Sequence, residues 1–352
     1  HEVDLLVVGL GPGGGSAAAR AAATGMSVIG IDRKQQLGDP VQCAEFIPNP
    51  MGGYARADGV LVQRINGMQT ELPSQARFAT AFPGLMIDRA RFDQAIAARA
   101  RHAGAELWSG ACLVNMDPEH SQARVRCQNG NLVSIGYRLL IAADGPGSSV
   151  AIQLGLAPLE TVNTRQYTVP LRLPYCDTDI FLSDDYPGGY GWLFPKGEVA
   201  NLGLGADRRY DRDLKAPLDR LHASMVARGI VGGRILGRTG GLIPVGGLRS
   251  KLYRGGAVFV GDAAGLTHPI TGAGIHAAVV SGEAAGEAAR TWLDGDPAAL
   301  DDYEEDMRDQ FQVALDRAVA RRRELADVWR TPMAGLDAAM RRGWIAFDEY
   351  FA

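Results

Sequence analysis

Three short stretches of the chain place glycine after an apolar run, and the first has a spacing with known chemistry. It runs from Gly9 to Gly15, and its residues Gly9, Gly11 and Gly14 follow the pattern G-x-G-x-x-G. Between a strand and a helix, such glycines permit a tight turn, let backbone N–H groups approach a pyrophosphate, and allow close packing of helix on strand. The stretch, with Pro12 inside it, therefore favours a dinucleotide whose phosphates lie at the positive end of the helix.

An acidic residue closes this first unit. The run 27–31 ends in Asp32, about 20 residues after the glycines, where such folds keep an acceptor for the adenosine ribose hydroxyls. Arg33 follows directly and is assigned to the same edge of the cofactor site. Strand, glycine turn, helix, strand and acid occur in the order that a dinucleotide-binding unit requires.

Two further pairs of glycine and aspartate follow apolar runs of strand length. Asp144-Gly145 comes after the run 139–143, and Gly261-Asp262 comes after a shorter run. Each pair taken alone is compatible with a simple turn. Together with the first stretch, and in this order, they predict three loops that converge on one dinucleotide.

A fourth motif consists of aromatic residues. The segment 187–195 reads Pro-Gly-Gly-Tyr-Gly-Trp-Leu-Phe-Pro. Side chains alternate between the two faces of a strand, so Tyr190, Trp192 and Phe194 are expected on one face. Such a row forms an apolar wall with one hydroxyl, which suits a long hydrocarbon; the core of an ordinary sheet is the alternative.

These motifs together resemble the flavoprotein class that contains the p-hydroxybenzoate hydroxylase-like aromatic hydroxylases and the geranylgeranyl reductases. The segment 187–195 fits the pattern Pro-x-x-Tyr-x-Trp-x-Phe-Pro of the geranylgeranyl reductase family without a mismatch, and Lys196 with the segment 200–205 extends the likeness. The similarity covers most of residues 4–295 at the level of motifs. It implies FAD as cofactor and NAD(P)H or another reductant as electron donor.

The resemblance also implies roles for individual residues. The first motif would hold the ADP half of FAD, Asp144 would lie near FAD and the path of the pyridine nucleotide, and Asp262 would contact the ribityl hydroxyls. Arg89 would lie against FAD, with a surface position as the alternative. Backbone N–H groups in the loop before Ile275 suit the negative charge of a reduced isoalloxazine. The expected cofactor-binding residues are Gly9, Gly11, Pro12, Gly14, Asp32, Arg33, Arg89, Asp144, Gly145, Gly261, Asp262, Pro269, Gly272, Ala273 and Gly274.

Cys43, Glu45, Tyr190 and Trp192 are the candidate catalytic residues. Cys43 falls where the family usually keeps a cysteine close to the flavin. Many relatives continue with small residues, often glycine, whereas this chain has a bulkier, charged run at 44–46. A reductase needs an acid that delivers a proton, and the sequence leaves the choice among Tyr190, Cys43 and Glu45 open.

Regular elements must place these motifs. The glycine-rich stretch is expected between a strand at 4–8 and a helix at 16–24. A second helix should begin after Asp88, which can cap it, and a hairpin should form around Asn129-Gly130 with a separate buried strand at 139–143. The remaining expected elements are short strands within 51–82, helices at 214–228 and 275–293, and a helical tail from 301 that is broken at Pro332.

The predicted fold class is α/β: a Rossmann-like FAD-binding domain of the GR2 type is interleaved with a sheet-rich substrate domain and followed by a helical C-terminal tail. The FAD-binding domain is expected to comprise residues 1–50, 80–150 and 255–295, and the substrate domain residues 51–79 and 151–254. The helical region 296–352 would cap the substrate domain or meet a partner.

Composition narrows the class of protein. The chain has 352 residues, 46% of them hydrophobic, and a net charge of -4, with no stripe of Lys and Arg interleaved with aromatics, so a large core in about two lobes is expected and nucleic acid is not. The basic run 321–323 is expected to be a solvated helix face. Four cysteines without C-x-x-C spacing argue against a metal site and favour a reducing, cytoplasmic setting. No apolar run approaches the ~18 residues of a membrane span, so only peripheral contact with a membrane is left open. The sequence also leaves the oligomeric state open.

The predicted function is reduction of C=C bonds in a long, isoprenoid-like substrate by hydride from reduced FAD. The alternative is an FAD-dependent monooxygenase that hydroxylates an aromatic ring, such as a peptide-borne Trp or Tyr. A flavin-binding scaffold without turnover is the third hypothesis. The fate of the reduced flavin separates them, because only a monooxygenase couples it to an oxygenated product.

Overall fold

The glycine-rich stretch joins the first strand of a parallel sheet to the helix that covers it. The computed structural model describes residues 1–207, 209, 213–329 and 336–352; in it β1 (Glu2–Val8) leads through the glycines into α1 (Pro12–Ala23). The helix begins four residues earlier than expected, because proline is favoured in a first turn, where its missing N–H costs nothing. Strand and helix are both buried along most of their length, as their apolar and small residues predict.

Seven further strands complete this sheet around β1. Its order is β17 (Tyr253–Arg254), β18 (Ala257–Phe259), β11 (Leu132–Ala142), β1, β2 (Val28–Asp32) and β8 (Glu106–Ser109), with β10 (Gln122–Arg126) on β11 and β9 (Cys112–Asp117) on β10. Strands β18, β11, β1 and β2 run parallel. In register, Val8 lies beside both Ile31 and Ala142, and Ala142 lies beside Phe259. The loops that follow β1, β11 and β18 therefore meet at one edge of the sheet, although they are far apart in sequence.

Helices of small residues pack on this sheet. They are α1, α2 (Arg89–His102), α3 (Ser149–Gln153), α5 (Gly261–Ala264) and α6 (Ile275–Leu293). A Cβ on Gly282 of α6 would lie 2.1 Å from the carbonyl oxygen of Gly13 in α1, so only glycine allows the two helices to approach this closely. The Asp88 carboxylate accepts a hydrogen bond from the backbone N–H of Arg91 at 3.0 Å, which confirms the predicted cap of α2.

The hairpin around Asn129-Gly130 is present, but the separate strand expected at 139–143 is not. Instead β11 is continuous over 132–142: its first part pairs antiparallel with β10 and its last part pairs parallel with β1 and β18. The strand continues from one part to the other because each half has its own neighbour.

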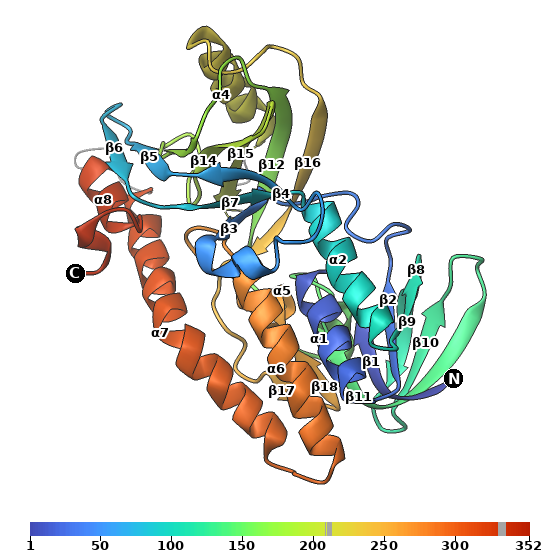
Figure 1. The fold of residues 1–352 in the computed structure, drawn as a ribbon. Coiled ribbons are helices and arrows are strands. Elements are labelled where there is room, and N and C mark those ends of the chain that lie inside the picture. Colours follow the sequence, from blue (N-terminus) through green and yellow to red (C-terminus); the bar gives the residue numbers. More distant parts are fainter. Residues whose placement is uncertain (208, 210–212, 330–335) are drawn as a thin grey trace.

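A second, seven-stranded sheet forms the other lobe. Its order is β16 (Gly237–Pro244), β12 (Thr161–Pro170), β15 (Val199–Asp207), β14 (Gly191–Lys196), β13 (Asp177–Phe181), β5 (Gly67–Glu71) and β6 (Arg77–Thr80). One face packs on α4 (Lys215–Ala227) through Leu193, Leu202 and Leu218, among others. A three-stranded sheet of β3 (Phe46–Pro48), β7 (Gly84–Ile87) and β4 (Leu61–Ile65), with a 3₁₀ turn at Asn49–Gly53, lies between the lobes in Figure 1.

The C-terminal region is helical and links the two lobes. Figure 1 shows α7 (Ala299–Val328) running from beside α6 up to the second sheet, where α8 (Leu336–Arg342) and a 3₁₀ turn (Asp348–Tyr350) follow. The predicted break at Pro332 lies outside the described residues. The α/β class with a helical C-terminal region is confirmed.

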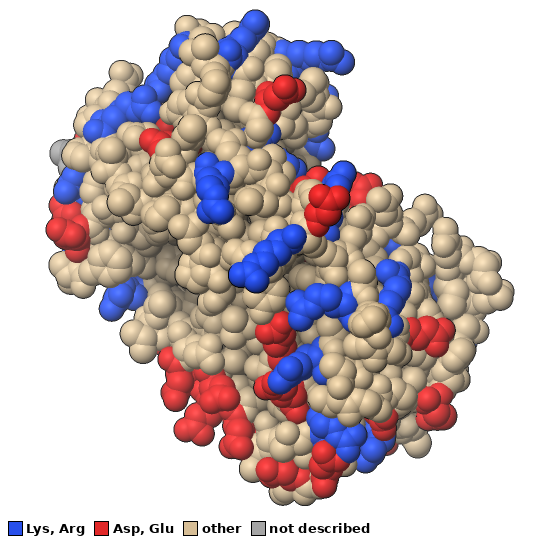
Figure 2. All heavy atoms as spheres, in the orientation of Figure 1, with Lys and Arg blue, Asp and Glu red and all other residues tan. Residues whose placement is uncertain are grey.

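Charged side chains are distributed unevenly over the face shown in Figure 2. Acidic residues gather over its lower left part, along the lower half of α7, a helix whose first turn contains Asp301 and Asp302. Within the described ranges, none of the helices has both the length and the apolar character that crossing a membrane requires.

The expectation that the basic run 321–323 is a solvated face is wrong for two of its three residues. Arg321 and Arg322 are buried. Arg322 pairs with Asp207 of β15 at 2.7 Å, and Arg321 donates to the carbonyl oxygen of Tyr350 at 3.0 Å. These partners lie far away in sequence, so helical charge alternation could not reveal them.

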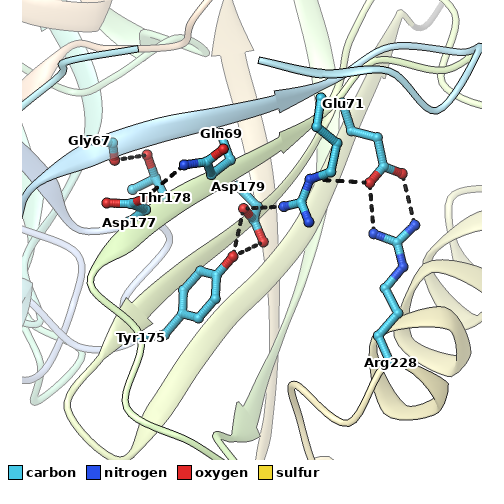
Figure 3. A network of polar contacts seen from close by, with 9 residues as sticks. Gly67, Gln69, Glu71, Tyr175, Asp177, Thr178, Asp179 and Arg228 are labelled. Carbon is cyan, nitrogen blue, oxygen red and sulfur yellow. Dashed lines mark hydrogen bonds and ion pairs between the residues drawn. The ribbon is translucent and has the colours of Figure 1, made fainter. Parts of the chain in front are cut away.

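A polar network joins strands β13, β5 and β6 of the second sheet to one another and to α4 (Figure 3). Buried Asp179 on β13 accepts hydrogen bonds from Tyr175 at 2.9 and 2.8 Å and pairs with Arg77 of β6 at 3.1 Å. Glu71 of β5 pairs with Arg228 at the end of α4 at 2.7 Å. Burial raises the pKa of Asp179 to about 6, although Tyr175 and Arg77 both oppose the shift.

Candidate functional site

The glycines of the first motif have the three different environments that a dinucleotide turn requires. Gly9 has a φ of 93°, and a Cβ there would lie 2.3 Å from the carbonyl oxygen of Ala143. A Cβ on Gly14 would lie 1.8 Å from the carbonyl oxygen of Gly9. At Gly11, in contrast, the nearest atom is Nη2 of Arg89, 3.9 Å away. Two glycines therefore close the turn and one leaves its backbone open to a ligand.

Asp32 lies at the end of β2, next to this turn. Its Oδ2 accepts a hydrogen bond from the backbone N–H of Leu10 at 2.8 Å, and its Oδ1 accepts one from that of Lys34 at 2.8 Å. Each carboxylate oxygen keeps a second lone pair for a ligand hydroxyl. Arg33, one residue further on, is exposed.

Asp144 of the second motif has one engaged and one free carboxylate oxygen. Oδ2 accepts hydrogen bonds from Ser149 Oγ at 2.9 Å and from the backbone N–H of Val150 at 3.1 Å. Oδ1 is buried and has no hydrogen-bond partner in the part of the chain that the structure describes. A buried acceptor left unpaired calls for an explanation, and a ligand that donates to it supplies one. Gly145 follows with a φ of 82°.

Asp262 of the third motif faces the loop that precedes α6. Its Oδ1 accepts a hydrogen bond from Thr267 Oγ1, and a Cβ on Gly274 would lie 2.8 Å from that hydroxyl and 3.0 Å from the carboxylate. Burial raises the pKa of Asp262, while the Thr267 hydrogen bond and the charge of Arg89 oppose the shift. Gly261 starts α5 on the same turn.

The loop 266–274 is held by its own hydrogen bonds. His268 Nδ1 accepts from the backbone N–H groups of Ile270 at 3.4 Å and Thr271 at 3.3 Å, and burial lowers the pKa of His268 to about 4. The imidazole is therefore neutral at pH 7 and supports the loop. Of the predicted cofactor residues in this loop, Pro269 is buried, Gly272 and Gly274 are half-buried and Ala273 is exposed.

Arg89 lies beside Gly11 of the first motif, and its charge acts on Asp262 of the third. Its guanidinium pairs with Asp93 through Nε–Oδ1 at 2.8 Å and Nη2–Oδ2 at 3.2 Å, and its positive charge lies near enough to Cys43 to favour the thiolate. Burial lowers the pKa of Arg89, but the Asp93 carboxylate more than offsets this, so the pKa lies above its ordinary value. The side chain is only 17% exposed and lies next to Gly11, so it is not a surface helix residue.

Glu45 connects the Cys43 loop to three other elements. Its Oε1 accepts a hydrogen bond from the backbone N–H of Arg89 at 2.9 Å and pairs with Lys196 of β14 at 2.8 Å. Its Oε2 accepts a hydrogen bond from Asn201 of β15 at 2.9 Å. Glu45 is buried and has a φ of 71°, which is unusual for a residue other than glycine. The glutamate tolerates this conformation because its carboxylate is bonded on both sides.

Cys43 lies next to Glu45 and near Arg89. Its sulfur accepts a hydrogen bond from the backbone N–H of Glu45 at 3.2 Å, and its carbonyl oxygen accepts one from Gln166 at 3.1 Å. Burial raises the pKa of the thiol, while the charge of Arg89 opposes the shift.

Tyr190, Trp192 and Phe194 lie on one face of the second sheet, as the alternation predicts, and we call them the aromatic wall. The rings of Tyr190 and Trp192 are 5.7 Å apart, and all three side chains belong to one apolar cluster. Tyr190 donates its hydroxyl to the carbonyl oxygen of Thr271, and Trp192 Nε1 donates to Gln166 at 3.0 Å. Burial, and then the neighbouring Cys43, raise the pKa of Tyr190. The aromatic wall therefore contacts the loop 266–274, which follows the third motif in the sequence.

Three residues of this arrangement were missed by the sequence analysis. Lys196 and Asn201 bind Glu45, and Gln166 bridges Cys43 to Trp192. Asn201 interrupts an apolar run in β15, which is the signal that could have found it, whereas Gln166 lies in the largely polar strand β12 and gives no such signal.

The C-terminal region covers the aromatic wall. Trp344 lies 4.8 Å from Tyr190 between ring centroids, and Leu336, Met340 and Phe347 join the same cluster. Tyr350 contacts His268 at 3.3 Å. The sequence left two roles open for this region, which were to cap the substrate domain or to meet a partner. The structure shows this region packed on the second sheet.

Several curated proteins with similar sequences are named digeranylgeranylglycerophospholipid reductase. A digeranylgeranylglycerophospholipid reductase from Methanocella arvoryzae is 32% identical over 341 residues, covering 90% of this chain and 85% of the relative. A protein named digeranylgeranylglycerophospholipid reductase 1 from Methanopyrus kandleri is 33% identical over 355 residues, with 90% of each chain covered. A scan against protein-family models finds no match.

Solved structures give the same result at the level of the fold. A geranylgeranyl bacteriochlorophyll reductase-like protein from Thermoplasma acidophilum superposes with a TM-score of 0.86 at 28% identity, covering 96% of this chain and 90% of that one. A flavin-dependent halogenase superposes with a TM-score of 0.74 at 17% identity, covering 99% of this chain and 71% of that one, which shows a shared fold.

The chain is an FAD-dependent oxidoreductase. Its fold, its glycine turn and its converging acidic residues all indicate this class. Within that class the chain belongs to the geranylgeranyl reductase family, because it is about one-third identical to digeranylgeranylglycerophospholipid reductases over most of its length. The resemblance found in the sequence is confirmed.

Proposed function

We propose that this protein reduces carbon–carbon double bonds in the isoprenoid chains of a lipid, with electrons that FAD receives from NAD(P)H or another reductant. The observation that carries the proposal is the contact between the aromatic wall and the third motif: Tyr190 donates its hydroxyl to Thr271 of the loop assigned to the flavin. An apolar face that adjoins a flavin loop suits a long hydrocarbon.

The residues present fit FAD. Gly11 leaves backbone open at the start of α1, and the free Oδ1 of Asp144 lacks a donor within the described residues. We assign the ADP half to Gly9, Gly11, Pro12, Gly14, Asp32 and Arg33, and the flavin half to Arg89, Asp144, Gly145, Gly261, Asp262 and the loop residues Pro269, Gly272, Ala273 and Gly274. We keep the division into an FAD-binding part (1–50, 80–150 and 255–295), a substrate part (51–79 and 151–254) and a C-terminal region (296–352).

FAD supplies a hydride once it is reduced, and the chain must orient the alkene, exclude water and deliver a proton. Trp192 and Phe194 present rings to the alkene, and Gln166 fixes the indole of Trp192 by its hydrogen bond. An alkene held against a rigid wall reaches the short separation that the reaction requires.

Cys43 is the group that we assign as proton donor. Burial raises the pKa of its thiol, so the proton is present at neutral pH. After the proton leaves, Arg89 and the backbone N–H of Glu45 stabilise the thiolate. Tyr190 is less suited, because its hydroxyl is already donated to Thr271. Glu45 is fully bonded and acts by positioning Cys43, Arg89 and Lys196.

A single-turnover experiment tests the proposal. Enzyme reduced with dithionite without oxygen is mixed with geranylgeranyl diphosphate, and the products are identified by mass spectrometry. A gain of two hydrogen atoms per double bond, together with reoxidation of the flavin, is expected. Flavin that reoxidises only when oxygen is admitted, with an oxygenated aromatic product, would instead establish a monooxygenase.

A further inference from the structure

The strand that carries the aromatic wall connects the loop 266–274 to the opposite end of the second sheet. Tyr190, just before β14, donates its hydroxyl to Thr271 of that loop. From there the strand runs to Lys196, and the chain turns at the exposed Gly197 into β15. A strand rises about 3.3 Å per residue, so the wall extends about 20 Å from Tyr190 to Lys196.

Four segments of the chain meet at this far end of the wall, and we call them the rim: 60–66, 171–176, 196–199 and 229–236. A Cβ on Gly197 would lie 3.6 Å from the side chain of Val62, which is ordinary van der Waals contact. The backbone N–H of Leu171 donates to the carbonyl oxygen of Glu198 at 2.9 Å, and the next N–H donates to that of Ile230 at 2.9 Å. The four segments therefore form one continuous surface.

The rim exposes large apolar side chains. Leu61 is 40% exposed, Val62 39%, Leu173 68% and Leu236 47%. Single exposed apolar residues are normal on a protein surface, whereas several on adjoining segments mark a surface that binds a partner or a membrane.

Exposed arginines accompany these apolar residues. Arg64, Arg172 and Arg234 belong to the rim, and none of them makes an ion pair with another residue that the structure describes. Glu198 is the sole acidic residue in the sequence of the four segments, and the whole stretch 220–261 contains no Asp or Glu. In Figure 2 the upper lobe shows more Lys and Arg than Asp and Glu, whereas acidic residues gather along the lower half of α7. Apolar side chains among unpaired cations complement a membrane surface with anionic lipids.

We propose that the rim docks this protein on a bilayer that contains anionic lipids, so that isoprenoid chains pass from the bilayer onto the aromatic wall. The inference rests on the proposed function. Arg64, Arg172 and Arg234 bind lipid phosphates, while Val62 and Leu173 enter the boundary between head groups and acyl chains. A chain that enters at Gly197 follows β14 toward Tyr190 and the loop assigned to the flavin.

Flotation with vesicles tests the docking directly. The holoenzyme is mixed with vesicles of three parts phosphatidylcholine to one part phosphatidylglycerol, or of phosphatidylcholine alone, and is centrifuged through a density gradient. It should float with the anionic vesicles, stay behind with the neutral ones, and be released from the anionic ones by high salt, which screens exposed charges. Equal flotation with both kinds of vesicle, or none with either, would overturn the proposal.

Variants of the rim locate the docking surface. The triple variant Arg64→Gln/Arg172→Gln/Arg234→Gln should bind anionic vesicles about tenfold or more weakly, because each cation near an anionic surface contributes to binding. The matched control is Arg101→Gln/Arg124→Gln/Arg126→Gln, which removes three exposed arginines from the other lobe and should bind nearly like wild type.

A second pair of variants tests the apolar part of the rim. Leu173→Ser should also weaken vesicle binding, because the lost side chain no longer enters the bilayer boundary. Ile152→Ser is the matched control, since Ile152 is 65% exposed on α3 in the other lobe. Flavin content and circular dichroism verify the fold of each variant.

Activity separates this inference from the proposed function. The substrate is a glycerophospholipid with two geranylgeranyl chains, supplied either in anionic vesicles or in neutral detergent micelles. The triple rim variant should reduce it at the wild-type rate in micelles and more slowly in vesicles. If the variant is as fast as wild type in vesicles, the rim assignment fails and the reductase function stands. If wild-type enzyme floats with anionic vesicles but leaves the lipid unchanged in both settings, the proposed function fails.

Discussion

The carboxylate of Glu45 and the ammonium group of Lys196 lie 2.8 Å apart, with side chains 5% and 19% exposed. This pair joins the Cys43 loop to β14. Glu45→Gln leaves the ammonium group without its counter-ion and should lower the free energy of unfolding of the FAD-free protein by about 3 kcal/mol. Urea denaturation followed by circular dichroism measures the change. Glu119→Gln, at an exposed position, is the control and should have no effect.

Combining the substitution with Lys196→Met tests whether the loss comes from the unpaired charge. The double variant should recover part of the lost stability, because neither charge then remains buried alone. A double variant that is less stable than either single variant would show that the two residues act independently.

Gly11→Ala separates binding of the cofactor from folding. A Cβ at this position meets no atom closer than 3.9 Å, so the apoprotein should fold normally, whereas FAD affinity should fall by about tenfold or more because the methyl group occupies space reserved for the pyrophosphate. Fluorescence titration with FAD measures the affinity. Gly53→Ala, in a turn with no neighbour within 4 Å, is the matched control. Unchanged FAD affinity in Gly11→Ala would contradict the placement of the dinucleotide.

Cys43→Ala should slow reduction of the alkene by about 100-fold while FAD still binds and is still reduced, which is the range lost with a general acid. Stopped-flow absorbance without oxygen measures the single-turnover rate. Cys112→Ala, at an exposed cysteine, is the control. If Cys43→Ala turns over at the wild-type rate, another group delivers the proton.

The same thiol determines a pH dependence. An acid must be protonated to act, and burial raises the pKa of Cys43 above its ordinary value. The single-turnover rate should therefore stay constant through neutral pH and fall only in the alkaline range, as pH rises through that raised pKa. A rate that falls between pH 6 and about 7.5 would indicate a group with an ordinary imidazole-like pKa instead.

Asp179 makes stability depend on pH in the opposite sense to most carboxylates. Its pKa is raised from 3.8 to about 6, so the folded protein binds this proton more tightly than the unfolded chain does. The contribution of this group is largest below pH 4 and is lost as pH rises to 6, by about 3 kcal/mol. Asp179→Asn, which keeps an acceptor for Tyr175, should remove this component. Urea midpoints of both proteins at pH 4.5 and 7 measure it, with Asp177→Asn as control.

The parts of the fold that could be predicted are those encoded by short local patterns. The turn at Gly9, the cap at Asp88 and the shared face of Tyr190 and Trp192 each depend on neighbours within a few residues. The convergence of the three motifs followed from one general fact, that the carboxyl ends of parallel strands meet at one edge.

The parts that could not be predicted depend on partners far away in sequence. Glu45 is bonded because Lys196 and Asn201 lie on strands more than 150 positions later, and a lone glutamate in a loop gives no sign of them. Arg322 is buried for the same reason, through Asp207. The contact between Trp344 and Tyr190 is formed by folding the C-terminal helices back on the second sheet, which local periodicity does not encode.

The insertion of β18 beside β11 has a consequence for how the protein is made. Residues 257–259 leave the ribosome only after all strands of the second sheet, so the edge of β11 that they cover stays bare while residues 143–256 are synthesised. An uncovered strand edge invites association with other chains. The nascent polypeptide therefore carries an incomplete nucleotide-binding sheet while residues 143–256 are made, and any delay in that interval lengthens the exposure of the strand edge.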